Sequence, residues 1–447
     1  MAAFMREEES YMNGFRQSKI EVAVVGDGAS GAILCAQLLR SIRPDEIHVR
    51  WLGRSKKFGL GLAYSTSDPD HLLNVPSKGM SAFENDPLHF LNWVQARDKK
   101  ASPESFLPRQ WYGEYLSALV PAGHPSLTVH PDDVMQIQKV SHSYQITTRK
   151  NETHPADVVI LAIGHCLSKA RFGRRPSFPL AEVDGQARIL IVGTGLTMVD
   201  TVLTLGRAPR QNEIVAISRH GLLPMVHARH DGNPGASHFR KIIHGSKPPT
   251  LRQAFAAMRT DCAEAESRGG DWRSVVDDVR PFIPSVWKSF SPADRRQFLR
   301  HVVHFWDSHR HRMPPEVAEK IYYLINSGRL KIKKGRFTSL VEEDGSWTVN
   351  WRSDTHELRR ERFDHVFDCT GLSRDLGATD SPLVRQMLRD GLLVISDPPL
   401  GAFPAPEAAG LEVLGHLLRG EYWESTAVPE IRKQAAAIVD RLLKLLN

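Results

Sequence analysis

Three glycines near the amino end have a spacing that suits contact with a phosphate. Gly26, Gly28 and Gly31 form a complete G-x-G-x-x-G directly after the apolar run IEVAVV. In such a turn the first glycine permits a tight bend, the second lets the backbone approach a pyrophosphate, and the third lets the next helix pack on the strand. With Ala29 and Ser30 between them, these glycines predict a dinucleotide-binding turn whose helix N-terminus receives the phosphates.

A second turn of the same kind occurs in ARILIVGTGLTMVDTVLTL, residues 187–205. Gly193, Thr194 and Gly195 follow an apolar strand, and Met198 replaces the third glycine. The next strand, in EIVAISRHG, ends without an acid and is followed by Arg219. Because an arginine at this position accommodates a 2′-phosphate, the second turn predicts a nicotinamide dinucleotide, with NADPH favoured over NADH.

The first turn lacks one usual partner. An acidic residue about 20 positions beyond the last glycine normally binds the adenosine ribose at the end of the second strand. That strand lies in EIHVRWLG, and its end holds Gly53 instead of an acid. Either Asp45, Glu46 or a backbone group replaces the acid, or adenosine binding is weaker than usual, and the sequence leaves this choice open.

The same order of elements follows both turns. Residues 127–164 and residues 330–371 each contain short strands with a hairpin, then a buried apolar strand that ends in glycine. In the second range, LKIKKG and FTSLVEE are predicted as two separate short strands. The closing glycines are Gly164 and Gly371. This repetition favours two tandem nucleotide-binding domains over a chance likeness of two turns.

We therefore expect an α/β fold with two Rossmann-like dinucleotide-binding domains, the second inserted in the first. The predicted first domain comprises residues 18–185 and 372–447, and the second comprises residues 186–371. A mostly helical excursion, about 245–325, is expected to interrupt the second domain. Ligands should bind at the carboxyl ends of the parallel strands.

The composition and charge argue against several other classes of protein. The chain has 447 residues with 41% hydrophobic and 24% charged content, which is typical of folded globular domains. No stretch reaches the roughly 20 apolar residues of a membrane helix, and the polar start is unlike a signal peptide, so a cytoplasmic protein is expected. Four separated cysteines fit a reducing compartment. The net charge of +7 comes without any nucleic-acid-binding signature, so an anionic cofactor or substrate explains it more simply.

Basic stretches between the second turn and its β-hairpin are the candidate substrate contacts. HARHDGNPGASHFR and HVVHFWDSHRHRMPP contain Arg229 and Arg310, which would attract an anion; a solvated basic face is the alternative. Their histidines lack an H-E-x-x-H motif or a cysteine cluster, so no metal site is predicted. No G-x-S-x-G elbow after a strand supports a serine hydrolase.

The chain as a whole resembles flavoproteins with two dinucleotide-binding domains, and more narrowly bacterial FAD/NAD(P)-binding proteins related to flavin-dependent N-hydroxylases of the aspartate N-monooxygenase kind. Ala162-Ile163-Gly164 and Cys369-Thr370-Gly371 stand in the place of their second nucleotide-contact motifs. The other segments that carry the resemblance span nearly the whole chain: GLGLAYSTSDPDHLLNVPSKGMSAFENDPLHFLNW, LPRQWYGEYL, GTGLTMVD, SRHGLLP, FWDSHRHRMPPEV and LRGEYWESTAVPEIRKQA.

The resemblance implies FAD in the first domain, held by the first glycine turn, with Gly164 near its adenosine half. The C-terminal segment with Glu424, Ser425 and Thr426 would return to the flavin, where a helix starting near Val428 would face the ring with its N-terminus. A surface helix is the alternative there. Asn74 would lie near the isoalloxazine, or would be a turn residue before Pro76.

These features predict an FAD-dependent oxidoreductase. In the first hypothesis NADPH reduces the flavin, O₂ reacts with it, and one oxygen atom passes to a small polar or anionic substrate such as an amino acid amine or a urate-like purine. The alternatives are an NAD(P)H oxidase or electron-transfer reductase, and a protein that binds a nucleotide without turnover. The sequence predicts neither the substrate nor the oligomeric state.

Overall fold

The structure is a computed structural model, and it describes residues 19–121, 123–165, 170–178, 180, 183–207, 211–228, 235–371 and 375–446. The chain divides into two compact units. The first consists of residues 1–65, 75–168 and 373–447, and the second of residues 66–74 and 169–372. The second unit therefore includes a short segment, Thr66–Asn74, that lies in sequence between two pieces of the first unit.

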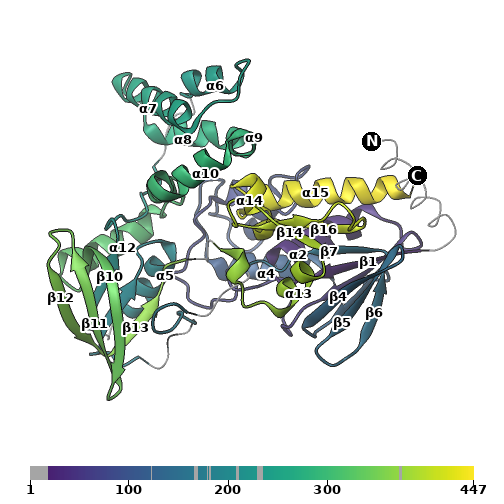
Figure 1. Cartoon of the computed structure of the whole chain (residues 1–447), viewed down its shortest axis with the longest axis horizontal. Coiled ribbons are helices and arrows are strands. Elements are labelled where there is room, and N and C mark those ends of the chain that lie inside the picture. Colours follow the sequence, from purple (N-terminus) through teal and green to yellow (C-terminus); the bar gives the residue numbers. More distant parts are fainter. Residues whose placement is uncertain are drawn as a thin grey trace. The chain divides into compact units, whose positions relative to one another are not determined.

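A five-stranded parallel sheet is the centre of the first unit, in the order β16-β7-β1-β2-β3. Its strands β16, β7 and β1 are labelled in Figure 1. Its strands are β1 (Ile20–Val25), β2 (Ile47–Leu52), β3 (Leu127–His130), β7 (Val158–Leu161) and β16 (Leu411–Val413). β7 is buried throughout, and only one residue of β1 is partly exposed. Continuous apolar strands of this kind are typical of parallel sheets that are covered on both faces.

Helices cover this sheet, and the longest comes from the C-terminal end of the chain. α15 (Val428–Leu445) lies beside α2 (Ala29–Ser41). Gln37 on α2 donates to the carbonyl oxygens of Ala82 at 2.7 Å and Arg432 at 3.1 Å, so it joins three distant segments. The other helices of the first unit are η1 (Ser77–Gly79), α3 (His89–Gln95), α4 (Arg109–Leu119), η4 (Leu376–Ala378), α13 (Pro382–Arg389), η5 (Gly415–Leu418) and α14 (Arg419–Tyr422).

An antiparallel ribbon adds a second layer to the first unit. It contains β4 (Val134–Val140), β5 (Ser143–Thr148) and β6 (Thr153–Ala156), and β14 (Leu393–Ile395) pairs separately with β15 (Ala402–Pro404). α13 packs on β4 through Gln386, whose amide accepts from the Ile137 N–H at 3.0 Å and donates to the Ile137 carbonyl at 2.8 Å. These two hydrogen bonds satisfy both the oxygen and the nitrogen of the buried Gln386 amide.

The second unit has a six-stranded sheet in the order β12-β11-β10-β9-β8-β13. β8 (Arg188–Val192), β9 (Glu213–Ser218), β13 (His365–Asp368) and the start of β10 (Leu330–Glu343) are parallel, while β11 (Ser346–Ser353) and β12 (Leu358–Phe363) continue it as an antiparallel ribbon. The prediction of two short strands in LKIKKG and FTSLVEE is wrong, because β10 runs through both. A bulge between Phe337 and Ser339 lets one strand pass from the parallel sheet into the ribbon.

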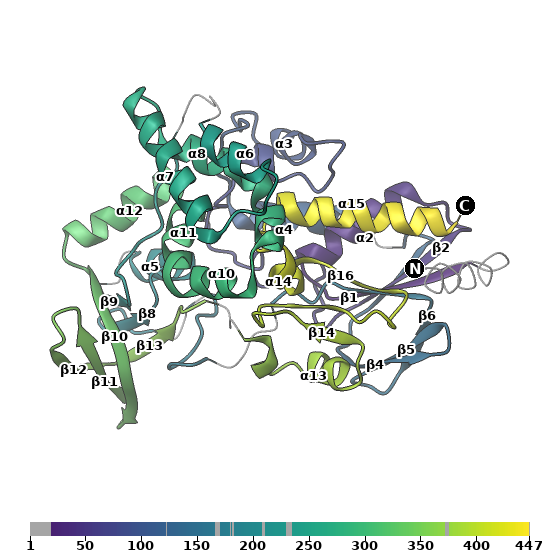
Figure 2. The same ribbon diagram turned by 45° about the horizontal axis from the view of Figure 1, so that its top comes forward.

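Helices follow β9 before the chain returns to the sheet. α6, α7 and α8 are grouped together in both views (Figures 1 and 2). The helices of the second unit are α5 (Leu196–Leu205), α6 (Ser237–Ile243), α7 (Leu251–Ser267), α8 (Trp272–Val279), η2 (Arg280–Phe282), α9 (Ile283–Ser289), α10 (Pro292–Gln297), the π-helical turn η3 (Phe298–Val302), α11 (Val303–Arg310) and α12 (Pro315–Asn326).

The predicted α/β fold class is confirmed: each unit combines a parallel sheet with a glycine turn, a helix and an antiparallel ribbon. Each sheet is buried in an apolar cluster of its own unit. Within the described residues, no helix combines the length and apolar character needed to span a bilayer.

Candidate functional site

The first glycine turn is fixed by close backbone contacts. Gly26 has φ +126°, and a Cβ there would lie 2.3 Å from the carbonyl oxygen of Ala162. A Cβ at Gly31 would lie 2.3 Å from the Gly26 oxygen and 2.8 Å from Nε1 of Trp51, which donates to that same oxygen. Both glycines are therefore required where the turn packs against β7 and β2.

The middle glycine leaves open space in front of α2. Gly28 is the N-cap, no side chain caps the helix there, and a Cβ at Gly28 would approach only the Cα of Gly61, at 3.7 Å. The first N–H groups of α2, over Ala29 and Ser30, are thus left for an external acceptor. An uncapped N-terminus behind an unobstructed glycine fits the pyrophosphate of a dinucleotide.

The second turn repeats this geometry in the second unit. Gly193 has φ +110°, and a Cβ there would lie 2.2 Å from the Cys369 oxygen, just as Gly26 meets Ala162. Gly195 is the uncapped N-cap of α5, and a Cβ there would meet nothing within 4 Å. Met198, in place of the third glycine, is fully buried in the core. This substitution leaves the phosphate-facing part of the turn unchanged.

Two details connect the turns to the neighbouring strands. The Thr194 hydroxyl donates to Ser218 Oγ at 2.9 Å, which ties the second turn to the end of β9. Gly164 and Gly371 follow β7 and β13 with φ +61° and +84°, and a Cβ at either would meet nothing within 4 Å. Both closing motifs therefore place a left-handed glycine at the carboxyl edge of a parallel sheet.

A basic group follows β9. Arg219 and His220 are exposed, and Lys334 on β10 lies opposite Ser218 in the parallel register. The rings of His220 and His304 are stacked with centroids 3.6 Å apart. Partial burial, together with the charges of Arg219 and Lys334, lowers the pKa of His220. Positive charge is thus concentrated where a 2′-phosphate would be expected.

The C-terminal segment returns to the first turn. A Cβ at Gly415 would lie 3.1 Å from Ser30 Oγ, so η5 touches the glycine turn. Glu424 and Ser425 are buried, the Ser425 hydroxyl has no hydrogen-bond partner among the described residues, and Thr426 is exposed. α15 starts at Val428 without a side-chain cap. This arrangement provides buried polar groups next to the N-terminus of α15.

His416 was not singled out in the sequence. It is 8% exposed, its Nδ1 has no hydrogen-bond partner in the described structure, and its ring lies 4.4 Å from that of His165, just beyond Gly164. Burial, with His165 and Arg419 nearby, lowers the pKa of His416 to about 2. The imidazole is neutral at neutral pH. Only the three-dimensional return of η5 to β7 brings these histidines together.

A buried cationic cluster lies in the second unit. Arg310 and Arg312 are 7% and 3% exposed, and Arg312 forms an ion pair with Asp277. Nε and Nη1 of Arg312 have no hydrogen-bond partner among the described residues. Burial lowers the pKa of Arg312, as do the charges of Arg310 and Arg273, against the opposing effect of Asp277. Unsatisfied buried guanidinium donors are rare, and an anionic ligand would satisfy them.

Asn74 and His227 adjoin this cluster. Nε2 of His227 donates to the Asn74 carbonyl oxygen at 3.1 Å. Burial and the charges of Arg312 and Arg310 lower the pKa of His227 to about 4, against the Asn74 hydrogen bond and Asp277. Its ring is therefore neutral and its Nδ1 is an acceptor. Arg229, the other predicted substrate contact, lies outside the described residues.

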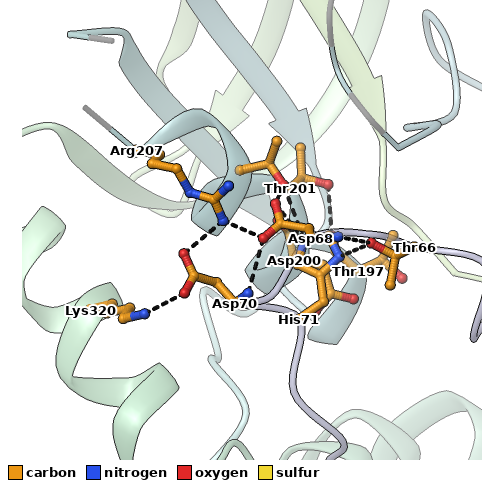
Figure 3. Close-up of polar contacts among 10 residues, drawn as sticks. Thr66, Asp68, Asp70, His71, Thr197, Asp200, Thr201, Arg207 and Lys320 are labelled. Atoms are coloured by element: carbon orange, nitrogen blue, oxygen red, sulfur yellow. Dashed lines mark hydrogen bonds and ion pairs between the residues drawn. The ribbon is translucent and has the colours of Figure 1, made fainter. Parts of the chain in front are cut away.

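The segment Thr66–Asn74 is fastened to α5 and α12 (Figure 3). His71 is 1% exposed and contacts Thr66 Oγ1 at 2.9 Å and Thr204 Oγ1 at 3.0 Å. Thr204 donates to Asp68 at 2.7 Å. Arg207 and Lys320 bind Asp70 at 2.8 and 2.7 Å. These bonds fix the path by which Asn74 reaches His227.

One set of potential metal ligands occurs among the described residues. His130, Glu152 and His154 place one ligand atom each within 4.8 Å of one another. Burial is the main effect lowering the pKa of both histidines, and the charge of Arg50 acts in the same direction. That nearby positive charge opposes cation binding, so the site carries no assignment.

Comparison with known proteins agrees with this geometry. Residues 23–166 match a family model described as FAD-NAD(P)-binding. No curated protein sequence matches the chain. The reduced ornithine hydroxylase of Pseudomonas aeruginosa superposes with a TM-score of 0.63 at 14% identity, over 96% of this chain and 100% of that one.

Two further solved structures have the same fold. The ornithine N-hydroxylase of Kutzneria sp. 744, with reduced FAD, NADP⁺ and L-ornithine, matches with a TM-score of 0.61 at 14% identity, over 96% of this chain and 99% of that one. Bacillithiol disulfide reductase from Staphylococcus aureus matches with a TM-score of 0.56 at 13% identity, over the same shares of the two chains. The expected likeness to FAD/NAD(P)-binding flavoproteins, including N-hydroxylases, is confirmed in fold.

Proposed function

We propose that this chain, which carries an FAD-NAD(P)-binding domain and the fold of two-domain flavoproteins, is an NAD(P)H-dependent flavin monooxygenase. FAD binds in the first unit and NADPH in the second. The observation that carries this proposal is the pair of glycine turns with the same geometry. Each turn leads into a helix whose N-terminus has no side-chain cap, and each lies beside the closing motif of a parallel sheet. One chain thus offers two dinucleotide sites.

When bound, FAD would supply hydride transfer from the nicotinamide and reaction with O₂. The residues of this chain would bind and orient the two cofactors. The N–H groups at the start of α2 and of α5 receive the two pyrophosphates. The N-terminus of α15 places partial positive charge next to the segment with Glu424 and Ser425, and this charge would favour an anionic ring bound there.

The substrate is proposed to be a small molecule that carries both an amine and an acidic group. The amine follows from the named substrate of the ornithine hydroxylases, which share the fold. The acidic group follows from the buried cluster of Arg273, Arg310 and Arg312, in which Arg312 keeps unsatisfied donors. Nε and Nη1 of Arg312 have no partner among the described residues, and either could donate a charge-assisted hydrogen bond to a carboxylate.

A thiol-dependent reductase is disfavoured by the cysteines. Cys35 is fully buried and its pKa is raised by burial; burial also raises the pKa of Cys369 to about 12 and of Cys262 to about 11. The reactive form of a thiol is the thiolate. None of these three described cysteines is thus suited to dithiol exchange, although bacillithiol disulfide reductase shares the fold.

The test is a product assay on the FAD-loaded protein. The protein is reduced anaerobically with NADPH, mixed with O₂ and a panel of amino acids, and assayed for hydroxylated amine and for H₂O₂. Product formed in proportion to NADPH consumed supports the monooxygenase. Stoichiometric H₂O₂ with every amino acid indicates an oxidase instead. Failure to take up FAD indicates a protein that binds a nucleotide without catalysing a reaction.

The substrate proposal has its own variant. Arg312→Gln should raise KM for an acidic amino acid roughly 10- to 100-fold, because the buried positive charge and a charge-assisted hydrogen bond are lost. NADPH oxidation without substrate should be unaffected. The matched control is Arg336→Gln, an exposed arginine on β10 of the same unit. An unchanged KM in the folded variant would remove Arg312 from the substrate site.

A further inference from the structure

The first turn lacks an acid at Gly53, and the structure excludes two of the possible replacements. β1 and β2 are parallel with Val25 opposite Leu52, so the glycine turn and Gly53 lie at the same edge of the sheet. Asp45 and Glu46 precede β2 and lie at the opposite edge. Glu46 is moreover bound by the backbone N–H and the side chain of Arg43 at 2.9 and 2.7 Å.

Another carboxylate occupies the place of the missing one. A Cβ built on Gly53 would lie 2.4 Å from Cβ of Asp27 and 2.9 Å from its Cγ. The two side chains would therefore start from nearly the same point. Asp27 is the residue between Gly26 and Gly28, so a carboxylate of the glycine turn itself stands at the end of β2. Gly53 is required because Asp27 fills that space.

The Asp27 side chain is held in a defined orientation. Its Oδ2 accepts the Ser55 N–H at 2.6 Å, and its backbone oxygen accepts the Gly59 N–H at 2.9 Å. Gly53 is fixed in turn by its own N–H, which donates to the His130 oxygen at 3.2 Å. Asp27 is only partly buried, and its Oδ1 has no hydrogen-bond partner among the described residues. One oxygen orients the carboxylate and the other remains for a ligand.

We propose that Asp27 binds the 2′- and 3′-hydroxyls of the adenosine ribose of the dinucleotide in the first unit, an inference that rests on the FAD site proposed above. A vicinal diol donates two O–H groups, and a carboxylate at the end of the second strand is the usual acceptor. A 2′-phosphate would instead face a negative charge. Asp27 thus makes the first unit selective for a dinucleotide without that phosphate, whereas Arg219 in the second unit favours one that has it.

The experiment measures FAD affinity of the full-length apoprotein by fluorescence titration. Asp27→Asn keeps an acceptor for the Ser55 N–H but loses the charge, and should weaken FAD binding roughly 10- to 100-fold. The matched control is Asp45→Asn, an exposed carboxylate at the other end of β2, which should bind as the wild type does. Circular dichroism and Tm of the apoproteins establish that the variants are folded.

An FAD analogue with 2′-deoxyadenosine identifies the group that Asp27 contacts. The wild type should bind this analogue more weakly than FAD, and Asp27→Asn should no longer distinguish the two. The exchange Asp27→Gly with Gly53→Glu moves the carboxylate to its usual position and should bind FAD more tightly than Asp27→Gly alone.

Three results would overturn the proposal: wild-type FAD affinity in Asp27→Asn, full discrimination of the analogue by that variant, or no gain from the exchange in a folded protein. A wild type that binds no FAD at all would instead overturn the proposed function, and with it this inference. The two failures are therefore distinct.

Discussion

His71 donates a hydrogen bond from Nε2 to the carbonyl oxygen of Asp200 across 3.0 Å, although the two residues are 129 positions apart in the sequence. The hydrogen must lie on Nε2 because a carbonyl oxygen only accepts. Asp200 belongs to α5, the helix that follows the second glycine turn. The buried imidazole therefore fastens the segment Thr66–Asn74 to the helix whose N-terminus is the proposed pyrophosphate site of the second unit (Figure 3).

Replacement of His71 by alanine should release this segment. The change removes a fully buried ring and its hydrogen bonds to Thr66, Thr204 and the Asp200 carbonyl oxygen, which should cost about 2–4 kcal/mol of local stability. Hydrogen exchange measured by mass spectrometry should show faster exchange in peptides covering residues 66–74. His301→Ala, an exposed histidine of the same unit, serves as control and should exchange as the wild type does. Unchanged protection in His71→Ala would contradict the anchoring role.

The same segment should make the second unit acid-sensitive. Burial alone would raise the pKa of Asp68, but hydrogen bonds from Thr204, the Asp70 backbone and Arg207, with the charge of His71, hold it below the ordinary 3.8. A lowered pKa stabilises the folded state above the unfolded value, and this stability is lost as the pH falls through the folded value. Asp68→Asn should therefore cost about 1–3 kcal/mol at pH 7 and progressively less below about pH 4.

Urea unfolding at pH 7 and pH 3.5 measures this difference. Asp344→Asn is the matched control, because Asp344 lies in an exposed turn with φ +50°, a conformation that asparagine tolerates. The control should change stability little at either pH. An Asp68→Asn effect that is equal at both pH values would contradict the assigned ion pair and hydrogen bonds.

The two glycines of the second turn have different roles, and replacing each with alanine separates them. Gly193→Ala places Cβ 2.2 Å from the Cys369 oxygen at φ +110°, so we expect a loss of about 2–4 kcal/mol in stability. Gly195→Ala meets no atom within 4 Å, so stability should change little. Its methyl group nevertheless enters the space in front of α5, and NADPH affinity should fall at least roughly tenfold. Thermal unfolding and NADPH titration of both variants test this; full NADPH affinity in Gly195→Ala would contradict the site.

The glycine turns could be predicted from sequence because their cause is local. Gly26 and Gly193 each follow an apolar strand, and the strand, turn and helix are contiguous in the chain. The ends of β7 and β13 were recognisable for the same reason, as apolar strands that close in glycine. A bulge such as the one in β10 leaves no comparable sequence signal, so that strand was divided in two.

The remaining features depend on contacts between distant segments. Asp27 and Gly53 explain each other only once β1 and β2 are aligned, and His416 meets His165 only because η5 returns to β7. Arg312 was passed over in favour of Arg229 and Arg310, since sequence shows charge but not which guanidinium is buried with unsatisfied donors. Hydrogen-bond satisfaction is a property of the folded chain.

Coenzyme preference tests the assignment of the second unit most directly. Arg219 is exposed just after β9, beside Lys334, and no acid follows this strand that would bind a free 2′-hydroxyl. Arg219→Gln should therefore lower NADPH affinity roughly 10- to 100-fold while NADH affinity stays unchanged, because only NADPH carries the phosphate that the guanidinium binds. Stopped-flow rates of flavin reduction against coenzyme concentration give both affinities. Arg252→Gln, on the exposed face of α7, controls for the loss of a positive charge. Equal losses for NADH and NADPH in Arg219→Gln would mean that this arginine contacts a part common to both coenzymes, and the preference for NADPH would then have to come from Lys334.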